Sequence, residues 1–270
     1  MAYPGIKESR AAELKEAIGQ KDWGTIVDPF YGAGGLSKAF FAGHTADRHI
    51  AGESFEPLRS LYQNVPNLTQ LADRFLGDMH EIGESALWAH LKQALRSESP
   101  RYGTSEAFVI LNNLSHGNGM RHNKKGQQNL PIGPSKLKAL IKRRSFIDPI
   151  VFRPNGCAIT WQKTIGQAGG QDAIALLDPP YLLADSVYPN EDPLACGVPP
   201  VTKAMCLGYG AIVAYNSNSL ELDFWFAKTA ADHGYSVTMN VTEWATKYSA
   251  KSSKKASTEA MWIFKKEVEL

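Results

Sequence analysis

The amino-acid sequence predicts an α/β protein with an open sheet and helices on both faces of that sheet. Residues 25–28 form a β-branched run ending in an acid, followed by a glycine-rich turn and a helix pattern, which is the first unit of a nucleotide-type fold. Residues 173–177 are an apolar run that stops at two prolines, as a buried strand with a sharp end does. At 270 residues the chain is expected to be one large domain or one domain carrying an insertion.

Four residues, Asp178-Pro179-Pro180-Tyr181, follow the second of these strands. Pro180 lacks a backbone N–H, and Pro179 is restricted by the proline after it, so Asp178 is expected at the carboxyl end of a strand beside a stiff loop. Ligands of open α/β sheets bind at that edge. An acid, two fixed carbonyls and an aromatic ring suit a planar amino group that is held and stacked. The alternative is a plain proline turn, although such a pattern arises by chance in roughly one chain of this length in a hundred.

The glycine-rich turn after the first strand spans residues 28–35. Gly32 and Gly34 allow the backbone to approach a ligand closely. The turn is not Gly-x-Gly-x-x-Gly, and no Lys-Ser/Thr pair follows it, so a dinucleotide or triphosphate cradle is a poor match. Asp28 would repel a phosphate and instead suits a cationic ligand, such as one with a free amino group.

A second strand over residues 48–52 ends in Glu53. An acid at this position, about twenty residues after the glycine-rich turn, holds a ribose diol in such folds, and Glu56 is a nearby competitor. Residues 67–106 have helical spacing, and within them Asp78 is interpreted as a solvated turn acid.

Residues 107–147 contain eight Lys or Arg residues and no Asp or Glu. Residues 108–111 indicate a buried strand or a helix start, the Lys124-Lys125-Gly126 step indicates a hairpin tip, and residues 136–144 indicate a basic helix. Dense Asn, Gln, Arg and His side chains can bond base edges or phosphates. This stretch therefore favours a nucleic-acid-reading loop, with an ordinary exposed loop as the alternative.

The rest of the chain predicts the second half of the sheet. A strand is expected near residues 157–161, a helix over 201–207, a strand over 211–215 ending at Asn216, and an amphipathic helix over 222–233. Two antiparallel strands, 236–241 and 259–264, close the chain on either side of a Lys/Ser-rich loop. Residues 182–200 lack periodicity and form a long loop next to the second strand end.

Composition excludes several classes of protein. The net charge of +2 and the 43% hydrophobic content are ordinary for a globular protein. The three cysteines, Cys157, Cys196 and Cys206, show no Cys-x-x-Cys spacing, which indicates a reducing compartment and no zinc site. No apolar run is long enough for a membrane span, and no signal-peptide pattern begins the chain. A cytoplasmic protein without a metal is expected.

Several motifs occur in an order that resembles a known family. They are Pro4-Gly5-x-Lys7, the turn from Asp28 to Gly34, the polar stretch from Asn112 to Gly133, and Asp178-Pro179-Pro180-Tyr181. This order is similar to that of the Dam-type (D12 class) DNA adenine N6-methyltransferases, whose target-recognition segment lies between the glycine-rich motif and the DPPY motif. Residues 121–133 also look like that family's pattern Arg-Tyr-Asn-x-x-Gly-x-Phe-Asn-Val-Pro-x-Gly.

The chain departs from the family pattern at four places. Asp28 stands where the family usually has Glu, His122 where it has Tyr, and Gln128 where it has Phe. The family often has an acid just before DPPY, at about Thr160, and this chain has none there. Thr160 or Asp78 would have to replace that acid.

The resemblance implies a Rossmann-like methyltransferase sheet with S-adenosylmethionine as its methyl donor. It implies a catalytic domain of residues 1–66 and 150–270 and an inserted target-recognition region of residues 67–149. The implied cofactor-binding residues are Lys7, Asp28, Phe30, Gly32, Gly34, Glu53 and Asp178. The implied catalytic residues are Asp178, Pro179, Pro180 and Tyr181. The implied DNA-binding residues are Asn112, Arg121, His122, Asn123, Lys124, Lys125 and Asn129.

The reaction implied by the resemblance is direct methyl transfer to the N6 amine of an adenine flipped out of double-stranded DNA, without a metal. A monomer in the cytoplasm of a prokaryotic cell, or one encoded by a phage, is expected. Two alternatives are an RNA adenine methyltransferase and a non-catalytic DNA-binding relative. The target sequence and the existence of a partner nuclease are left open.

Overall fold

The computed structural model describes residues 8–19, 22–95, 99, 101–115, 131–148, 154, 156–158, 160–179, 197–217, 219–245 and 256–267. The elements in chain order are η1 (Glu8–Arg10), α1 (Ala11–Ile18), β1 (Trp23–Asp28), α2 (Gly35–Phe41), β2 (Ala46–Gly52), α3 (Glu56–Gln63), α4 (Leu68–Ile82), α5 (Glu84–Ala94), α6 (Thr104–Leu114), α7 (Pro134–Arg143), β3 (Gly156–Ala158), α8 (Trp161–Ile165), β4 (Ala173–Leu177), α9 (Val198–Cys206), β5 (Ala211–Ser217), α10 (Leu220–His233), β6 (Tyr235–Ala245) and β7 (Ala256–Lys266).

The seven strands form one sheet in the order β3-β2-β1-β4-β5-β7-β6. The five strands from β3 to β5 run parallel, whereas β7 is antiparallel to both β5 and β6. The strand order reverses between β1 and β4, because β2 and β3 extend the sheet one way from β1 while β4 and β5 extend it the other way. Such a reversal opens a crevice at the carboxyl ends of the two central strands.

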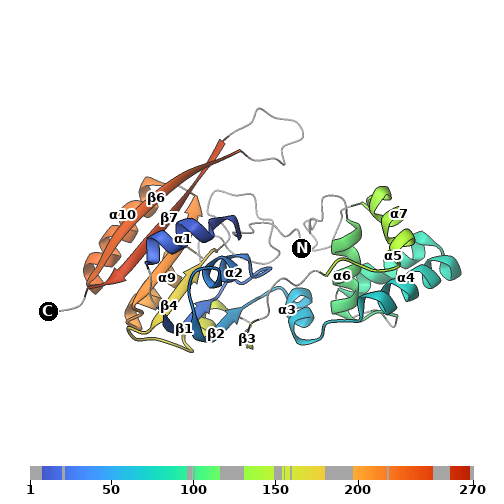
Figure 1. Cartoon of the computed structure of the whole chain (residues 1–270), viewed down its shortest axis with the longest axis horizontal. Helices are drawn as coiled ribbons and strands as arrows, with labels where there is room; N and C mark the ends of the chain where they lie inside the picture. Colours follow the sequence, from blue (N-terminus) through green and yellow to red (C-terminus); the bar gives the residue numbers. More distant parts are fainter. Residues whose placement is uncertain are drawn as a thin grey trace.

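Helices cover both faces of the sheet, as the sequence predicts (Figure 1). On one face, α1 and α2 bury Leu14 and Phe40 against residues such as Ile26 and Val213. On the other face, α8, α9 and α10 pack against alternate residues of the same strands. The central strands β1, β4 and β5 are therefore buried on both sides, which explains why the sequence of β4 is a continuous apolar run.

Several element boundaries differ from those that the sequence predicts. Of the two alternatives for residues 108–111, a buried strand or a helix start, the structure shows a helix, α6, which begins four residues earlier at Thr104. Trp161 begins the short helix α8 instead of ending a strand, because the Thr160 side chain accepts a hydrogen bond from the Lys163 N–H and caps that helix. Helix α9 begins at Val198, with prolines in its first turn, where no hydrogen bond to their nitrogens is needed.

The insertion between β2 and β3 is a helical part with its own core, beside the sheet in Figure 1. Apolar residues of α4, α5 and α6 form this core together with Leu140 of α7. Leu58 and Leu61 of α3 also belong to it. By packing, the helical part therefore begins at α3, about ten residues earlier than the sequence-based boundary at residue 67.

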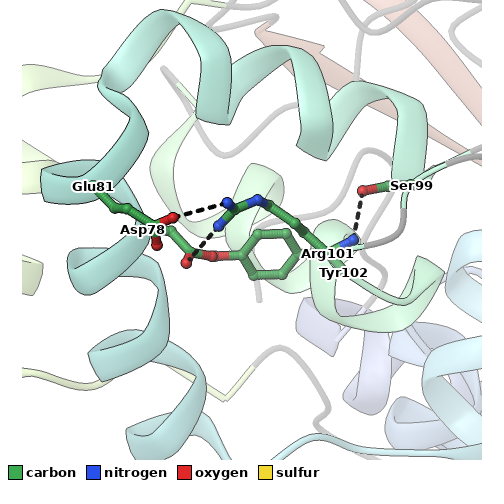
Figure 2. A network of polar contacts seen from close by, with 5 residues as sticks. All are labelled: Asp78, Glu81, Ser99, Arg101 and Tyr102. Carbon is green, nitrogen blue, oxygen red and sulfur yellow. Dashed lines mark hydrogen bonds and ion pairs between the residues drawn. The ribbon is translucent and has the colours of Figure 1, made fainter.

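Asp78 joins the helices of this part and does not lie in a solvated turn (Figure 2). It lies within α4, where its carboxylate accepts hydrogen bonds from the Tyr102 hydroxyl at 2.5 Å and from Arg101 at 3.0 Å. Arg101 also reaches Glu81 on the next turn of α4. The network fixes the segment before α6 to α4, so the role of Asp78 is structural.

The Tyr102–Asp78 hydrogen bond leads to a first prediction. Tyr102→Phe removes a hydroxyl from a side chain that is 3% exposed, and we expect the free energy of unfolding to fall by about 1 kcal/mol. Urea denaturation followed by circular dichroism measures this change. Glu81→Gln is the matched control, because its ion pair is exposed and should contribute less. A Tyr102→Phe protein as stable as the parent would contradict the role given to the network.

Candidate functional site

The carboxyl ends of β1 and β4 meet at the reversal of strand order. Asp28 is the last residue of β1, and Asp178 directly follows β4. The register aligns Val27 with Ala175, so both acids lie at the carboxyl edge of neighbouring parallel strands. The predicted positions of Asp28 and Asp178 at strand ends are confirmed, whereas their roles in binding stay predictions.

Asp28 is a buried carboxylate with one satisfied oxygen. Its side chain is 1% exposed, and its Oδ2 atom accepts a hydrogen bond of 2.7 Å from the Ser37 hydroxyl. Its Oδ1 atom has no hydrogen-bond partner in the part of the chain that the structure describes. Burial, opposed by the Ser37 hydrogen bond and reinforced by the nearby charge of Asp178, raises the pKa of Asp28 to about 7.

Ser37 connects Asp28 to a buried histidine. The Ser37 oxygen lies 3.0 Å from the His49 Nε2 atom, and because the single hydroxyl proton goes to Asp28, the Nε2–H group of His49 is assigned as donor to Ser37. Burial lowers the pKa of His49 to about 4, so the ring is neutral at pH 7. Ser37 and His49 were not predicted as site residues. The sequence signal for each was a polar residue beside apolar ones, in α2 for Ser37 and in β2 for His49.

The glycine-rich turn is held in a left-handed backbone conformation. Gly32 and Gly34 have φ angles of 52° and 75°, and a Cβ on Gly34 would lie 2.6 Å from the Tyr31 hydroxyl oxygen, so glycine is required there. The Tyr62 hydroxyl donates to the Gly32 carbonyl, and the Gly32 N–H donates to Glu53 Oε2 at 3.0 Å. The turn is thereby attached to β2 and to α3.

Glu53, rather than Glu56, lies at the turn. Its side chain is buried, and its second oxygen accepts from the Phe55 N–H at 2.7 Å, whereas Glu56 begins α3 and is exposed. Arg59 donates to the Glu53 carbonyl at 3.0 Å. Backbone N–H groups of Gly32 and Phe55 thereby hold the two oxygens of Glu53 at the turn.

Neither Thr160 nor Asp78 replaces the acid that the resemblance leads one to expect near β3. Thr160 is exposed and caps α8, and Asp78 belongs to the helical network. The half-buried thiol of Cys157 on β3 lies near Glu53 instead. Burial and, to a smaller extent, the charge of Glu53 raise the pKa of the Cys157 thiol to about 12. A neutral thiol therefore occupies this edge of the site.

The comparisons with known proteins add the family. The family model for the D12 class N6 adenine-specific DNA methyltransferases matches residues 3–188. The chain belongs to this family. No curated protein matches its sequence.

Solved structures similar to this methyltransferase are distant in sequence. A precorrin-6y C5,15-methyltransferase from Geobacter metallireducens is 10% identical with a TM-score of 0.40, and the match covers 98% of this chain and 92% of that chain. Magnesium protoporphyrin IX methyltransferase from Synechocystis, solved with bound S-adenosylmethionine, is 11% identical with a TM-score of 0.38, over 96% and 77% of the two chains. The strand order of the sheet, rather than these matches, establishes the fold.

S-adenosylmethionine is the cofactor of this methyltransferase, and the site fits it. The donor carries a sulfonium and a free ammonium group, and Asp28 offers a buried carboxylate oxygen with no partner among the described residues. A positive charge near Asp28 and Asp178 would relieve the repulsion that, together with burial, raises the pKa of Asp28.

No described helix is long and apolar enough to cross a membrane. The described residues contain no cluster of three or more His, Cys, Asp or Glu side chains that could hold a metal.

The predicted site residues fall into three groups. Asp28, Gly32, Gly34, Glu53 and Asp178 come together at the carboxyl edge of the sheet, with Phe30 partly buried beside them and Pro179 buried after β4. Asn112 does not lie on a DNA-facing surface, because its side chain is 1% exposed inside α6. The others lie outside the described residues and stay predictions: Lys7, Arg121, His122, Asn123, Lys124, Lys125, Asn129, Pro180 and Tyr181.

The chain that follows Lys7 is fixed close to the same edge of the sheet. Arg10 is buried, and its guanidinium donates to Glu259 on β7 at 2.8 Å and to Thr242 on β6 at 3.0 Å. Glu259 pairs with Ser217, the last residue of β5. This anchor therefore holds the start of the described chain at the carboxyl end of β5.

The segment that carries most of the predicted DNA-binding residues has a closed base. Ser115 forms an antiparallel bridge with Ile132, and the Gly133 N–H donates to the Leu114 carbonyl at 2.7 Å. The Lys136 amino group donates to the Ser115 carbonyl at 2.8 Å. The chain therefore re-enters the helical part beside the point where it leaves, as the base of a hairpin would require.

The raised pKa of Asp28 predicts how stability depends on pH. In the cofactor-free protein this pKa is raised from 3.8 to about 7, so between those values the folded state holds a proton that the unfolded state has lost. Stability therefore falls as the pH rises through this window and levels off above it. Asp28→Asn has no such proton, so its stability relative to the parent should increase from pH 4 to pH 8. Urea denaturation of both proteins across this range measures the difference, and a constant difference would contradict the raised pKa.

Proposed function

We propose that the protein is a site-specific DNA methyltransferase that transfers the methyl group of S-adenosylmethionine to the N6 amine of a flipped adenine. Besides membership of the D12 class family, one observation supports this reaction most directly: Asp28 and Asp178 lie together where the strand order reverses. One acid suits a cationic cofactor, and the other begins the motif that suits a planar amino group. An enzyme of this class needs both ligands side by side at one crevice.

Cofactor binding is assigned to the residues around the glycine-rich turn. When bound, S-adenosylmethionine supplies an electrophilic methyl group on a positively charged sulfur. The Oδ1 atom of Asp28 accepts from the ammonium of its methionine part, and Ser37 holds that carboxylate in place. Gly32 and Gly34 allow the close approach, and Glu53 accepts from the ribose hydroxyls.

The target amine is assigned to the stretch after β4. Asp178 and the carbonyl of Pro179 accept the two N–H groups of the adenine amine, which draws the nitrogen toward tetrahedral geometry and directs its lone pair at the methyl group. Tyr181 stacks on the flipped base, and Lys7 helps to position base or cofactor. The protein contributes orientation and matched charge rather than a covalent intermediate.

DNA recognition is assigned to the helical part, from α3 to α7, and to the segment that leaves it at Ser115 and returns at Ile132. Within that segment, Arg121, His122, Asn123, Lys124, Lys125 and Asn129 are the proposed contacts to bases and phosphates. We expect the enzyme to act on double-stranded DNA as a monomer.

Asp178 tests the proposed reaction directly. Asp178→Asn loses the charged acceptor for the amine, so we expect the rate of methyl transfer to fall at least about 100-fold, while binding to duplex DNA stays within about twofold of the parent. Transfer of labelled methyl groups to duplex DNA, single-stranded DNA and RNA measures the rate and the substrate class. A near-normal rate would exclude the assignment of Asp178, and a preference for RNA would favour an RNA adenine methyltransferase.

Asp28 tests the proposed cofactor site separately. Asp28→Asn removes the charge but retains a group that can accept from Ser37, and we expect S-adenosylmethionine to bind about 10- to 100-fold more weakly, since hydrogen bonds to charged groups contribute about 1.5–3 kcal/mol. Isothermal titration calorimetry measures this affinity. Cys157→Ser, at the other edge of the site, is the control that keeps both acids. Equal affinity of Asp28→Asn and the parent would remove Asp28 from the cofactor site.

A further inference from the structure

Helix α7 presents three cations that no described contact neutralises. Lys138, Lys142 and Arg143 are exposed, and among the described residues none of them takes part in an ion pair or hydrogen bond. The helix contains no acid. Two neighbouring cations differ, because Arg144 pairs with Asp73 at 3.2 Å and Lys136 donates to a backbone carbonyl.

The α7 cations, defined as Lys138, Lys142 and Arg143, lie on a helix that is held at both ends. At its start, Lys136 donates to the Ser115 carbonyl. Ser115 lies at the base of the recognition segment, defined as the stretch between Ser115 and Ile132. After its end, the Asn113 side chain accepts from the Ile147 N–H at 2.9 Å and donates to the Ile147 carbonyl at 3.1 Å. The first contact joins α7, and the second joins the segment that follows α7, to α6. The backbone that carries the α7 cations therefore keeps a fixed position relative to the start of the recognition segment.

The spacing of the α7 cations suits a phosphate backbone. Lys138 and Lys142 are four residues apart and therefore lie on the same face of the helix, separated along its axis by about 6 Å. Successive phosphates of one DNA strand advance by about 3.4 Å along the duplex axis, so the lysine spacing is close to the rise over two such steps, about 7 Å. Buried Leu140 faces the helical core instead, which leaves the charged side of α7 toward solvent.

We propose that the exposed face of α7 is a second DNA-contact surface, which binds phosphates beside the target site without reading the base sequence. This inference rests on the proposed function only in taking duplex DNA as the partner. The recognition segment would select the sequence, while the α7 cations would add affinity that is the same for every sequence and that decreases with salt. Because the backbone of α7 is already held by its contacts with α6, association needs to order only the side chains of these cations.

The salt dependence of DNA binding tests this proposal. We would replace the α7 cations together, as Lys138→Gln/Lys142→Gln/Arg143→Gln, and measure binding to two duplexes of unrelated sequence by fluorescence anisotropy over a range of KCl concentrations. Each lost phosphate contact should reduce the slope of log K against log salt by about 0.9. We expect a reduction of about 2–3, equal for both duplexes.

Lys228→Gln is the matched control, because Lys228 is also an exposed helical lysine but lies on α10, on the far side of the sheet from the helical part (Figure 1). It should leave the slope unchanged. A triple variant with the parent slope, or with weaker binding to only one duplex, would overturn the proposal. If the slope falls but the parent protein transfers no methyl group to adenine, the α7 surface stands and the proposed function fails. If transfer is normal and the slope is unchanged, the α7 surface alone fails.

Discussion

The buried carboxylate of Asp28 is the constraint on which the site depends. A carboxylate removed from water is costly unless charge or hydrogen bonds compensate it. Here Ser37, supported by neutral His49, satisfies one oxygen, and the other has no partner among the described residues. Asp178, placed nearby by the strand order, increases the cost. Either a proton on Asp28 or a cation at the crevice relieves the remaining cost, and the positive charge of S-adenosylmethionine fits the second case.

The helical part is the second structural unit, beside the sheet (Figure 1). Its core is independent of the sheet, and the Asp78 network holds the segment before α6 to α4. Helix α6 then ends at the base of the recognition segment, and α7 is joined to α6 at both of its ends. The helical frame would therefore hold the proposed DNA-reading segment and the proposed phosphate-binding face in a constant relation to each other. Precise positioning of this kind is what transfer to a flipped base requires.

Local sequence predicted the parts of the site that depend on strand ends and turns. A parallel strand buried on both faces has a distinctive apolar run, so the positions of Asp28, Glu53 and Asp178 followed from the residues that precede them. Glycine at positive φ likewise marked the turn at Gly32 and Gly34. The predictions for Asp78 and Asn112 were wrong because a polar residue in a helix has no local sign of what it faces. Asp78 meets Tyr102, which is 24 positions away in sequence, and Asn112 is enclosed by packing.

The sequence by itself determined the fold class, the order of the motifs and the family, because hydrophobic periodicity and turn residues act over a few neighbouring positions. Only the tertiary structure decided how the acids interact. The pKa of Asp28 depends on burial, on Ser37 and on Asp178, which is 150 positions away in sequence. It also decided that Cys157 rather than an acid lies near Glu53, and that α7 is fixed beside the base of the recognition segment. Such contacts arise from strand order and helix packing, which join residues that are distant in the chain.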